Sequence, residues 1–293
     1  MHSICFNPCR KRPSSLLLGL LLLPFSMSLH GKTPERIITL TPHLTEMVYA
    51  VGAGKQLVAT DDASDWPPEV TALPHVANYR SINVEALLAL QPDLIIAWGE
   101  SQRQLLTVLR QLKLPVLVLN SVHLEDLPRE LRLLGTRTGH TEEGNKAADH
   151  VEKQLTTLEH HYNAKTRVRV FYQLWSSPLM TVANGSWIQE AITLCGGVNP
   201  FADSPAPYPQ IGEEAVVASN PDIILATQSS DLARWQKWPM LPAVKNKQLH
   251  TVNKNWLNRL TPRILLGIDE LCQKIDQARV SGSVSPLANY SER

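Results

Sequence analysis

The sequence predicts an α/β protein with two Rossmann-like lobes, each built on a central parallel sheet and joined to the other by one long α-helix. Three observations lead to this prediction: a segment that occurs twice, strand and helix patterns that alternate on both sides of the middle of the chain, and a long amphipathic stretch between the two copies. Alternating strands and helices are typical of parallel sheets, and a repeat at a fixed offset indicates a duplicated unit.

The repeated segment covers residues 85–97 and again residues 214–226. Glu-Ala, Pro-Asp and a run of aliphatic residues recur in both copies at one offset of 129 residues, which also relates Tyr79 to Tyr208. In each copy the proline cannot continue the short helix before it, and the apolar run that follows suits a parallel strand covered on both faces. The repeat therefore predicts two similar lobes with the functional site between them.

The N-terminal lobe is expected over residues 33–138. Its first strand is followed by a helix that Thr41 would cap and Pro42 would begin. The strands of this lobe are expected at residues 36–40, 57–60, 94–97 and 116–119, with a further helix over residues 102–112.

A single helix over residues 139–165 is expected to join the lobes. Glu142 and Glu143 supply acids for its first turn, and apolar residues recur at helical spacing from Ala147 to Tyr162. Within this segment, a helix that begins at Thr141 would have about 24 residues and a length of roughly 36 Å. This is longer than one lobe requires, and the stretch lies midway between the two copies of the repeat.

The C-terminal lobe is expected over residues 166–279, followed by a polar tail over residues 280–293. We expect its elements to be a strand over 167–174, a helix that Gly196 and Gly197 end, the second repeat copy, a short strand over 249–252 and a last helix over 262–275.

Residues 1–28 have the pattern of a secretory signal peptide. A basic stretch over residues 10–12 precedes a short apolar core over residues 16–24, and small residues follow around Ser28. The apolar core is too short to span a bilayer comfortably. We therefore expect an exported protein that is located in the periplasm.

The mature chain would keep two of the four cysteines, Cys195 and Cys272, because the other two lie in the signal. In an oxidising compartment such a pair is best interpreted as a disulfide, with two buried free thiols as the alternative. The disulfide would close a loop of 77 residues. In the chain-entropy description it would stabilise the fold by roughly 4 kcal/mol.

Composition argues against several classes of function. Without the three basic residues of the signal, the net charge of +1 becomes −2, so nothing in the charge points to nucleic acid or an anionic membrane. The glycines at 52 and 54 complete neither a phosphate-binding loop nor a dinucleotide fingerprint, and no serine-hydrolase elbow or zinc-protease motif occurs. We expect no enzyme, with a secreted hydrolase as the alternative.

Histidine spacing predicts no metal site. His43, His75, His123 and His250 fall in predicted loops or near strand ends, but their spacing matches no compact ligand motif. A receptor for a transition-metal solute remains a minor alternative.

Aromatic residues are the strongest indication of a ligand. They gather in predicted loops and at strand ends, where parallel sheets bind ligands beyond their carboxyl edges. A large, partly apolar ligand is therefore expected. The aromatic residues in these places are Trp66, Tyr79, Trp98, Trp175, Trp187, Tyr208 and Trp256.

The mature chain resembles the class III periplasmic binding proteins of ABC importers, and within them the cobalamin-binding branch. The resemblance covers nearly all of residues 36–275. The segments that carry it are Arg-Ile-Ile-Thr-Leu-Thr-Pro at 36–42, Ser-Asp-Trp-Pro-Pro at 64–68, the first Pro-Asp strand through Trp98, Cys-Gly-Gly-Val-Asn at 195–199, Tyr-Pro-Gln at 208–210, Asn-Trp-Leu-Asn-Arg at 255–259 and Pro-Arg at 262–263.

The resemblance implies a receptor that captures vitamin B12 (cobalamin) between its lobes, with no cofactor beyond this transported ligand. The sequence has nothing like the Asp-x-His-x-x-Gly signature of corrinoid enzymes, so we expect no protein ligand to cobalt. It implies a ligand site at Tyr79 and Tyr208 from opposite lobes and at the loop Asn255, Trp256, Leu257, Asn258 and Arg259. We add Trp66, Trp98 and Trp175 to this site. The sequence departs from the family at Tyr79, where members carry Trp, and at Ala63, where they carry a ligand-contacting Tyr.

The resemblance also implies a partner. Family members use one exposed glutamate on each lobe to engage arginines of the membrane permease, and these align with Glu85 and Glu214. Two separated negative charges can orient docking on a basic partner. We expect a monomer that opens and closes only slightly. A receptor of the same fold for ferric siderophore, haem or another corrinoid is the main alternative.

Overall fold

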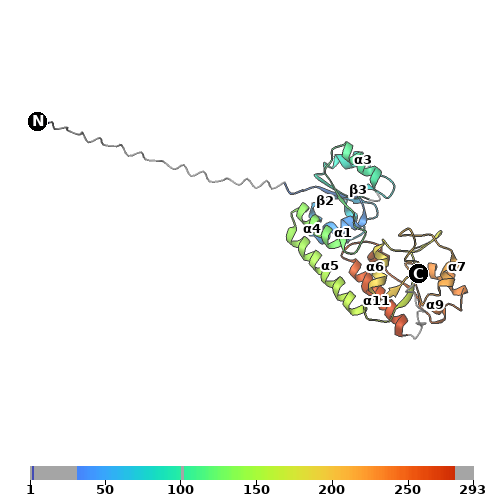
Figure 1. Cartoon of the computed structure of the whole chain (residues 1–293). Coiled ribbons are helices and arrows are strands. Elements are labelled where there is room, and N and C mark those ends of the chain that lie inside the picture. Colours follow the sequence, from blue (N-terminus) through green and yellow to red (C-terminus); the bar gives the residue numbers. More distant parts are fainter. Residues whose placement is uncertain (1, 3–31, 100–101, 281–293) are drawn as a thin grey trace. The chain divides into compact units, whose positions relative to one another are not determined.

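The computed structural model describes residue 2, residues 32–99 and residues 102–280. The expected signal peptide and polar tail thus lie outside the described residues, apart from His2 and Val280. The described residues from Thr33 onward belong to one compact unit (Figure 1). Within them the chain forms two parallel sheets, one in each half, with helices packed on both faces.

The first sheet has five parallel strands in the order β3-β2-β1-β4-β5. Its central strands are buried at nearly every position, which explains the uninterrupted apolar runs in the sequence. The strands are β1 Ile37–Thr39, β2 Leu57–Asp61, β3 His75–Ala77, β4 Leu94–Trp98 and β5 Val116–Leu119.

Helices cover this sheet on both faces. Thr41 precedes the first helix with Pro42 at its start, as predicted, although the Thr41 side chain makes no capping bond to the helix. The helical elements are α1 Pro42–Ala50, η1 Gly54–Gln56, η2 Pro68–Ala72, α2 Val84–Ala89, α3 Arg103–Gln111 and α4 Asp126–Thr138.

The second sheet has four parallel strands in the order β11-β10-β6-β9. A small antiparallel hairpin, formed by β7 and β8, follows strand β6 in the chain. The strands are β6 Val168–Gln173, β7 Trp175–Ser176, β8 Leu179–Met180, β9 Gly197–Val198, β10 Ile223–Ala226 and β11 Leu249–Thr251. The helical elements are α6 Trp187–Leu194, α7 Glu213–Ser219, α8 Ser229–Leu232, η3 Ala233–Lys237, α9 Pro242–Lys245, α10 Lys254–Leu257 and α11 Ile264–Val280.

Helix α5, Thr141–Tyr162, joins the two halves (Figure 1). It packs against α4 and α1 on the N-terminal side and against α6 and α11 on the C-terminal side. The predicted fold class, two parallel-sheet lobes joined by one long helix, is confirmed. Helix α4 was not predicted: it runs antiparallel to α5, and the two backbones approach so closely at Gly135 and Gly144 that a Cβ on either would clash with the other.

The two repeat copies fold alike. Helices α2 and α7 each end at a residue in the left-handed region, Gln91 and Asn220, which are again 129 positions apart. The aspartate of each Pro-Asp pair then bonds to the backbone N–H of an arginine at the start of the first strand of its own lobe: Arg36 immediately precedes β1, and Arg169 is the second residue of β6. Asp93 accepts from the amide of Arg36 at 2.8 Å, and Asp222 accepts from the amide of Arg169 at 2.9 Å.

The core is continuous between the halves. One cluster of buried residues includes β1 and β4, then α4 and α5, and then β6, α6 and α11. Two further clusters cover the opposite face of each sheet. The predicted disulfide is confirmed: Cys195 at the end of α6 is bonded to Cys272 of α11, with their Cα atoms 4.8 Å apart. Because both helices also pack near α5, the disulfide lies at the base of the C-terminal lobe.

Candidate functional site

The predicted ligand-binding residues lie beyond the carboxyl ends of the strands in both sheets. In the N-terminal lobe they follow β2, β3 and β4, and in the C-terminal lobe they follow β6 and β11 or precede α7. Strands of a parallel sheet end at a common edge, and that edge is where such folds bind ligands. The topology therefore places these residues on the expected edge of each sheet.

Three aromatic side chains are unusually exposed there. The exposed fraction is 87% for Tyr79, 60% for Trp175 and 44% for Trp66. Arginines cover part of two rings: the Arg80 guanidinium lies 5.0 Å from the Tyr79 ring centre, and that of Arg263 lies 4.3 Å from the Trp66 ring. Exposed aromatic rings at a sheet edge mark an interaction surface.

Other predicted residues are more enclosed. Trp98 is half-buried at the end of β4, and its ring meets the edge of His43 at 5.0 Å between centres. Its indole N–H is buried and has no hydrogen-bond partner among the described residues. Tyr208 is also half-buried, and burial raises the pKa of its phenol, so the hydroxyl stays protonated at neutral pH.

In the loop over residues 255–259, Leu257 is buried and the other four residues are half-buried. Asn253 caps the short helix α10 by accepting from the amide of Asn255 at 3.0 Å. The side chain of Leu257 is fully buried in the core, and its carbonyl accepts a hydrogen bond from the Trp187 indole. The turn of α10 directs the Leu257 side chain inward, so this predicted site residue can face a ligand only through its backbone. Asn258 accepts from the hydroxyl of Tyr172 at 2.9 Å.

Arg259 connects this loop to the N-terminal lobe. Its Nη1 donates to Glu46 of α1 at 2.9 Å and also to Asp65, which lies in the loop after β2. Glu46 is only 4% exposed. The two carboxylates raise the pKa of Arg259 further, against the effect of its burial.

Glu46 is a site residue that the sequence analysis missed. Besides Arg259, its carboxylate accepts from Arg263 Nη1 at 3.1 Å and from the hydroxyl of Thr261 at 2.9 Å. Its neighbours Leu44, Met47 and Val48 are fully buried. One carboxylate within an otherwise apolar helix surface was the available signal, because a buried acid requires a partner.

His43 lies beside this cluster. Burial, together with the positive charge of Arg259, lowers the pKa of His43 to about 4. Its Nδ1 shares a hydrogen bond of 3.1 Å with the hydroxyl of Thr41. At neutral pH the imidazole is therefore an uncharged polar group next to Trp98.

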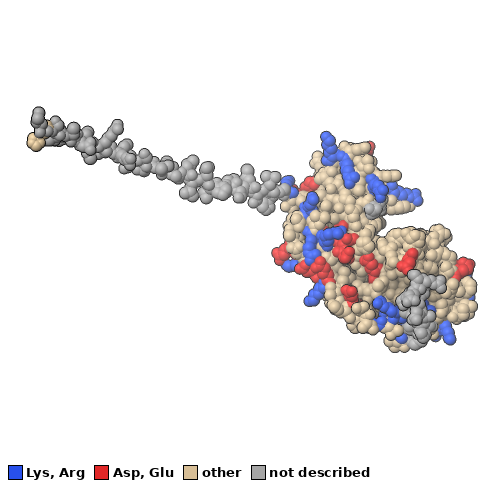
Figure 2. Space-filling model, in the orientation of Figure 1, with Lys and Arg blue, Asp and Glu red and all other residues tan. Residues whose placement is uncertain are grey.

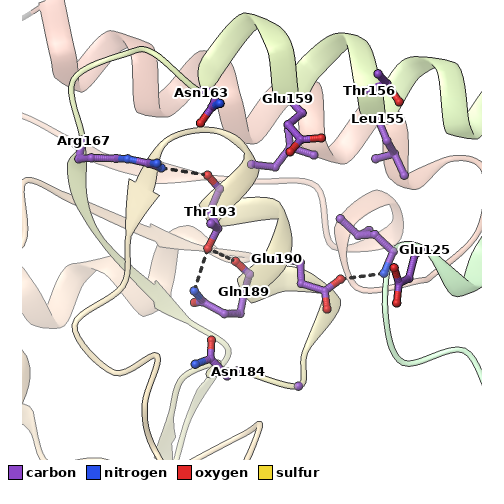
Figure 3. A pocket seen from close by; sticks show the side chains of 13 residues that line it. Glu125, Leu155, Thr156, Glu159, Asn163, Arg167, Asn184, Gln189, Glu190 and Thr193 are labelled. Carbon is purple, nitrogen blue, oxygen red and sulfur yellow. Dashed lines mark hydrogen bonds between the residues drawn. The ribbon is translucent and has the colours of Figure 1, made fainter. Parts of the chain in front are cut away.

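A second contact joins the lobes near α5. Glu190 of α6 accepts from the amide of Leu124 at 2.8 Å and pairs with the ring of His123, both in the loop before α4 (Figure 3). This hydrogen bond raises the pKa of His123. The contact borders a hollow of about 670 Å³, whose walls include Leu155 and Glu159 of α5.

Some polar groups of this hollow bind each other. Gln189 donates to the hydroxyl of Thr193 at 3.1 Å, and Arg167 donates to the carbonyl of the same threonine at 3.4 Å. Figure 3 shows both bonds. We assign no ligand to it.

Three of the predicted ligand residues each border a separate hollow. Trp66 borders one of about 360 Å³ together with Glu46 and Arg263. Tyr79 borders one of about 460 Å³ beside the start of α3, and Asn255 borders one of about 660 Å³ between the loops that follow β10 and β11. Ala63 is exposed in the loop before Trp66.

The two predicted docking residues are exposed at matching places. Glu85 lies in the first turn of α2 and Glu214 in the first turn of α7. Both side chains are exposed, and neither forms a hydrogen bond or ion pair with another described residue. On the face that Figure 2 shows, acidic and basic side chains are interspersed.

Two searches of the described residues gave no result. No group of three or more His, Cys, Asp or Glu side chains in this part of the chain could hold a metal ion. Among the helices that the structure describes, none is both long and apolar enough to cross a membrane.

Taken together, the fold and the exposed aromatic edges define a two-lobed α/β protein that binds a solute. Residues 37–255 match the family model of the periplasmic binding proteins. The chain belongs to this family, whose members bind solutes and are not enzymes, so the hydrolase alternative is excluded.

Several relatives of this chain are named for the solute that they bind. The chain is 37% identical to the vitamin B12-binding protein of Vibrio parahaemolyticus, over 91% of this chain and 98% of the relative. It is 41% identical to the vitamin B12-binding protein of Vibrio cholerae serotype O1, over 81% and 88%. The vitamin B12-binding protein of Pectobacterium atrosepticum is 37% identical, over 91% and 96%.

Solved structures of periplasmic binding proteins are also similar to this chain. The periplasmic vitamin B12-binding protein BtuF of Vibrio cholerae superposes with a TM-score of 0.78 at 39% identity, covering 84% of this chain and 98% of that one. The periplasmic haem-binding protein HutB of the same species superposes with a TM-score of 0.71 at 26% identity, covering 81% and 97%.

Proposed function

We propose that this protein captures vitamin B12 (cobalamin) between its lobes in the periplasm and delivers it to an ABC importer of the inner membrane. The observation that carries the proposal is the similarity, over nearly the whole chain, to several vitamin B12-binding proteins at 37–41% identity. The haem-binding neighbour is less similar, at 26% identity. Cobalamin is the transported ligand, and no further cofactor enters the proposal.

The side chains at the sheet edges suit such a ligand. A corrin ring is broad and flat, with methyl groups and uncharged amides around it, and aromatic rings can cover this face without introducing charge. In our proposal the ligand contacts are Tyr79, Trp66 and Trp98 on the N-terminal lobe and Tyr208, Trp175 and the loop of residues 255–259 on the other. Leu257 contributes through its backbone at most, because its side chain is in the core.

Two positions distinguish this chain from the family pattern. Ala63 stands where family members carry a tyrosine, so this part of the site offers only a methyl group. Tyr79 replaces a tryptophan and is almost fully exposed. Both changes remove aromatic surface from the N-terminal lobe, so the neighbouring Trp66 would carry more of the contact.

We propose that Glu85 and Glu214 dock the receptor on arginines of the permease. Each carboxylate is exposed, lies in the first turn of a repeat helix and has no partner among the described residues. Charges of this kind control orientation and association rate more than affinity. We further propose that residues 1–28 are removed as a signal peptide and that the mature protein is a monomer whose lobes are residues 33–138 and 166–279, joined by residues 139–165.

Calorimetric titration with cyanocobalamin, and separately with haem and a ferric siderophore, tests the ligand. We expect one site per chain for cyanocobalamin and no binding of the other two at tens of micromolar. If haem binds and cyanocobalamin does not, the proposed ligand is wrong.

Uptake in a strain that lacks its own receptor tests the docking. Glu85→Lys combined with Glu214→Lys should abolish cobalamin uptake while the purified variant binds cyanocobalamin as the parent does. Glu143→Lys, at an exposed acid of α5 outside the proposed ligand site, is the control and should leave uptake unchanged. Loss of ligand affinity in the double variant would contradict the docking role.

A further inference from the structure

The contacts between the lobes form a reciprocal pair. Glu46 lies on α1, the first helix after strand β1, and Glu190 lies on α6, the first helix after strand β6. Each carboxylate accepts hydrogen bonds from the opposite lobe, at the turn that precedes that lobe's last helix. The turn at His123 and Leu124 precedes α4, and the turn at 261–263 precedes α11.

Each of these two turns has a backbone hydrogen bond between residues three positions apart at the start of its helix. The amide that begins α4, of Asp126, donates to the carbonyl of His123 at 3.1 Å. The amide that begins α11, of Ile264, donates to the carbonyl of Thr261 at 2.8 Å.

The two carboxylates differ in their surroundings. Glu46 is 4% exposed and binds two arginines and a fully buried threonine. Glu190 is half-buried and binds one backbone amide and one histidine. Hydrogen bonds between charged groups are about twice as strong as neutral ones, and they are screened least where water is excluded. Glu46 is therefore the stronger of the two contacts.

The Glu46 contact also determines how Arg259 is presented. Arg259 uses Nη1 for both Glu46 and Asp65. Its Nη2 and Nε make no hydrogen bond to another described residue, and the side chain is 16% exposed. Glu46 and Asp65 balance the charges of Arg259 and Arg263, so the cluster offers donors without net charge. Donors of this kind match uncharged amide oxygens.

We propose that Glu46 is a positioning residue for ligand binding: it orients Arg259 at the ligand site and, through Arg263 and Thr261, sets the distance between the lobes. The part that concerns the ligand rests on the proposed function. Preorganisation of this kind raises affinity by lowering the entropy that binding costs.

Glu46→Gln tests the proposal, and Glu130→Gln is the matched control. Glu130 is also 4% exposed, but it accepts from the Asn120 amide at 2.6 Å and from the Ser121 hydroxyl, so its partners are within the N-terminal lobe. Both variants make the same chemical change in a buried acid. We expect Glu46→Gln to raise the Kd for cyanocobalamin about 10- to 100-fold and Glu130→Gln to change it less than about 2-fold.

A second measurement needs no ligand. Nitroxide labels at Ala89→Cys and Ala218→Cys, exposed equivalent positions on α2 and α7, report the distance between the lobes by pulsed electron resonance. The native cysteines are held in their disulfide. We expect a narrow distance distribution with Glu46 present, a broader one with Glu46→Gln and an unchanged one with Glu130→Gln.

Two further variants distinguish the positioning role of Glu46 from a failure to fold or a general loss of stability. If Glu46→Gln does not fold, Thr261→Val can replace it, because this change removes one hydrogen bond to Glu46 with little change in volume. We expect Thr261→Val to raise the Kd for cyanocobalamin about 3- to 10-fold. In the background of Arg259→Gln, Glu46→Gln should weaken binding far less than it does alone, which a general loss of stability would not produce.

The possible results distinguish a failure of the positioning role from a failure of the proposed function. Unchanged affinity and distances in Glu46→Gln, or equal losses in Glu46→Gln and Glu130→Gln, would overturn the positioning role. Absence of cyanocobalamin binding by the unmodified protein would instead reject the proposed function, and the distance measurement would still decide whether Glu46 sets the separation of the lobes.

Discussion

The two copies of the repeat share a backbone but differ in what surrounds it. In the C-terminal copy Asp222 is fully buried and binds the Arg169 side chain as well as its amide. In the N-terminal copy Asp93 is exposed and binds only backbone amides, of Glu35 and Arg36. The two copies therefore share the connection between helix and strand, but the aspartate that stabilises this connection is buried in one lobe and exposed in the other.

The same contrast holds at the ligand edge. Tyr79 is exposed in the N-terminal copy, whereas its counterpart Tyr208 is half-buried. Asn83 caps α2 by accepting from the Ala86 amide at 3.0 Å, whereas Gly212 precedes α7 without a side-chain cap. The N-terminal edge is therefore held by local bonds, and the C-terminal edge by packing.

The largest difference in stability between variants of the two copies is expected at the aspartates. Asp222→Ala leaves the Arg169 guanidinium without its buried partner and should lower the free energy of unfolding by about 3–5 kcal/mol. Asp93→Ala removes exposed hydrogen bonds to amides and should cost about 1 kcal/mol. Urea unfolding of the two variants, followed by circular dichroism, measures the difference. Equal costs would show that burial does not distinguish the copies.

A smaller effect is expected at the two tyrosines. Tyr79→Ala should leave the free energy of unfolding within about 0.5 kcal/mol of the parent, because its side chain is almost fully exposed. Tyr208→Ala should lower it by about 1–2 kcal/mol through lost packing. Both should weaken cyanocobalamin binding about 10-fold, as expected for aromatic contacts of a buried ligand. Calorimetry and thermal unfolding separate the two effects, and a stability loss at Tyr79 would contradict its assignment as an exposed contact.

The smallest effect concerns the His123–Glu190 pair. The pair raises the pKa of His123 in the folded state, chiefly through the hydrogen bond that the His123 ring donates to Glu190 and with help from the charges of Asp126 and Glu125. A raised pKa means that this contribution is fully present below the unfolded value, near 6.5, and is lost as pH rises through the folded value. The side chains are 43% and 33% exposed, so the contribution is below about 1 kcal/mol.

Unfolding of the parent and of His123→Gln between pH 5.5 and 8.5 measures this contribution. The difference in stability between the two proteins should shrink as pH rises. A difference that is constant across this range would exclude titration of His123 as its source.

The fold was predictable because its determinants are local. The apolar runs at 94–97 and 223–226, the Pro-Asp pairs and the spacing of apolar residues from Ala147 to Tyr162 each act within a few residues. Helix α4 escaped prediction for a physical reason: Pro128 and Gly135 disfavour an isolated helix, whereas here Gly135 permits close contact with Gly144 of α5.

The candidate site was predictable only in part. Its aromatic residues follow from their place after strands, but the bonds of Glu46 to the 259–263 segment join residues more than 200 positions apart. No local pattern specifies such a contact. Leu257 illustrates a second limit, because a motif identifies a loop as part of a candidate site without determining which of its side chains is buried.

The reciprocal carboxylates have a consequence for the modularity of the chain. Each lobe carries the acid that completes the turn of the other, so neither half contains all the groups that satisfy its own polar surface. A lobe from a relative with a different acid or a different turn would bring an unmatched charge to the junction. Recombination between such receptors should therefore tolerate exchange of the loops at the ligand edge far better than exchange of whole lobes, even though the chain arose from two copies of one unit.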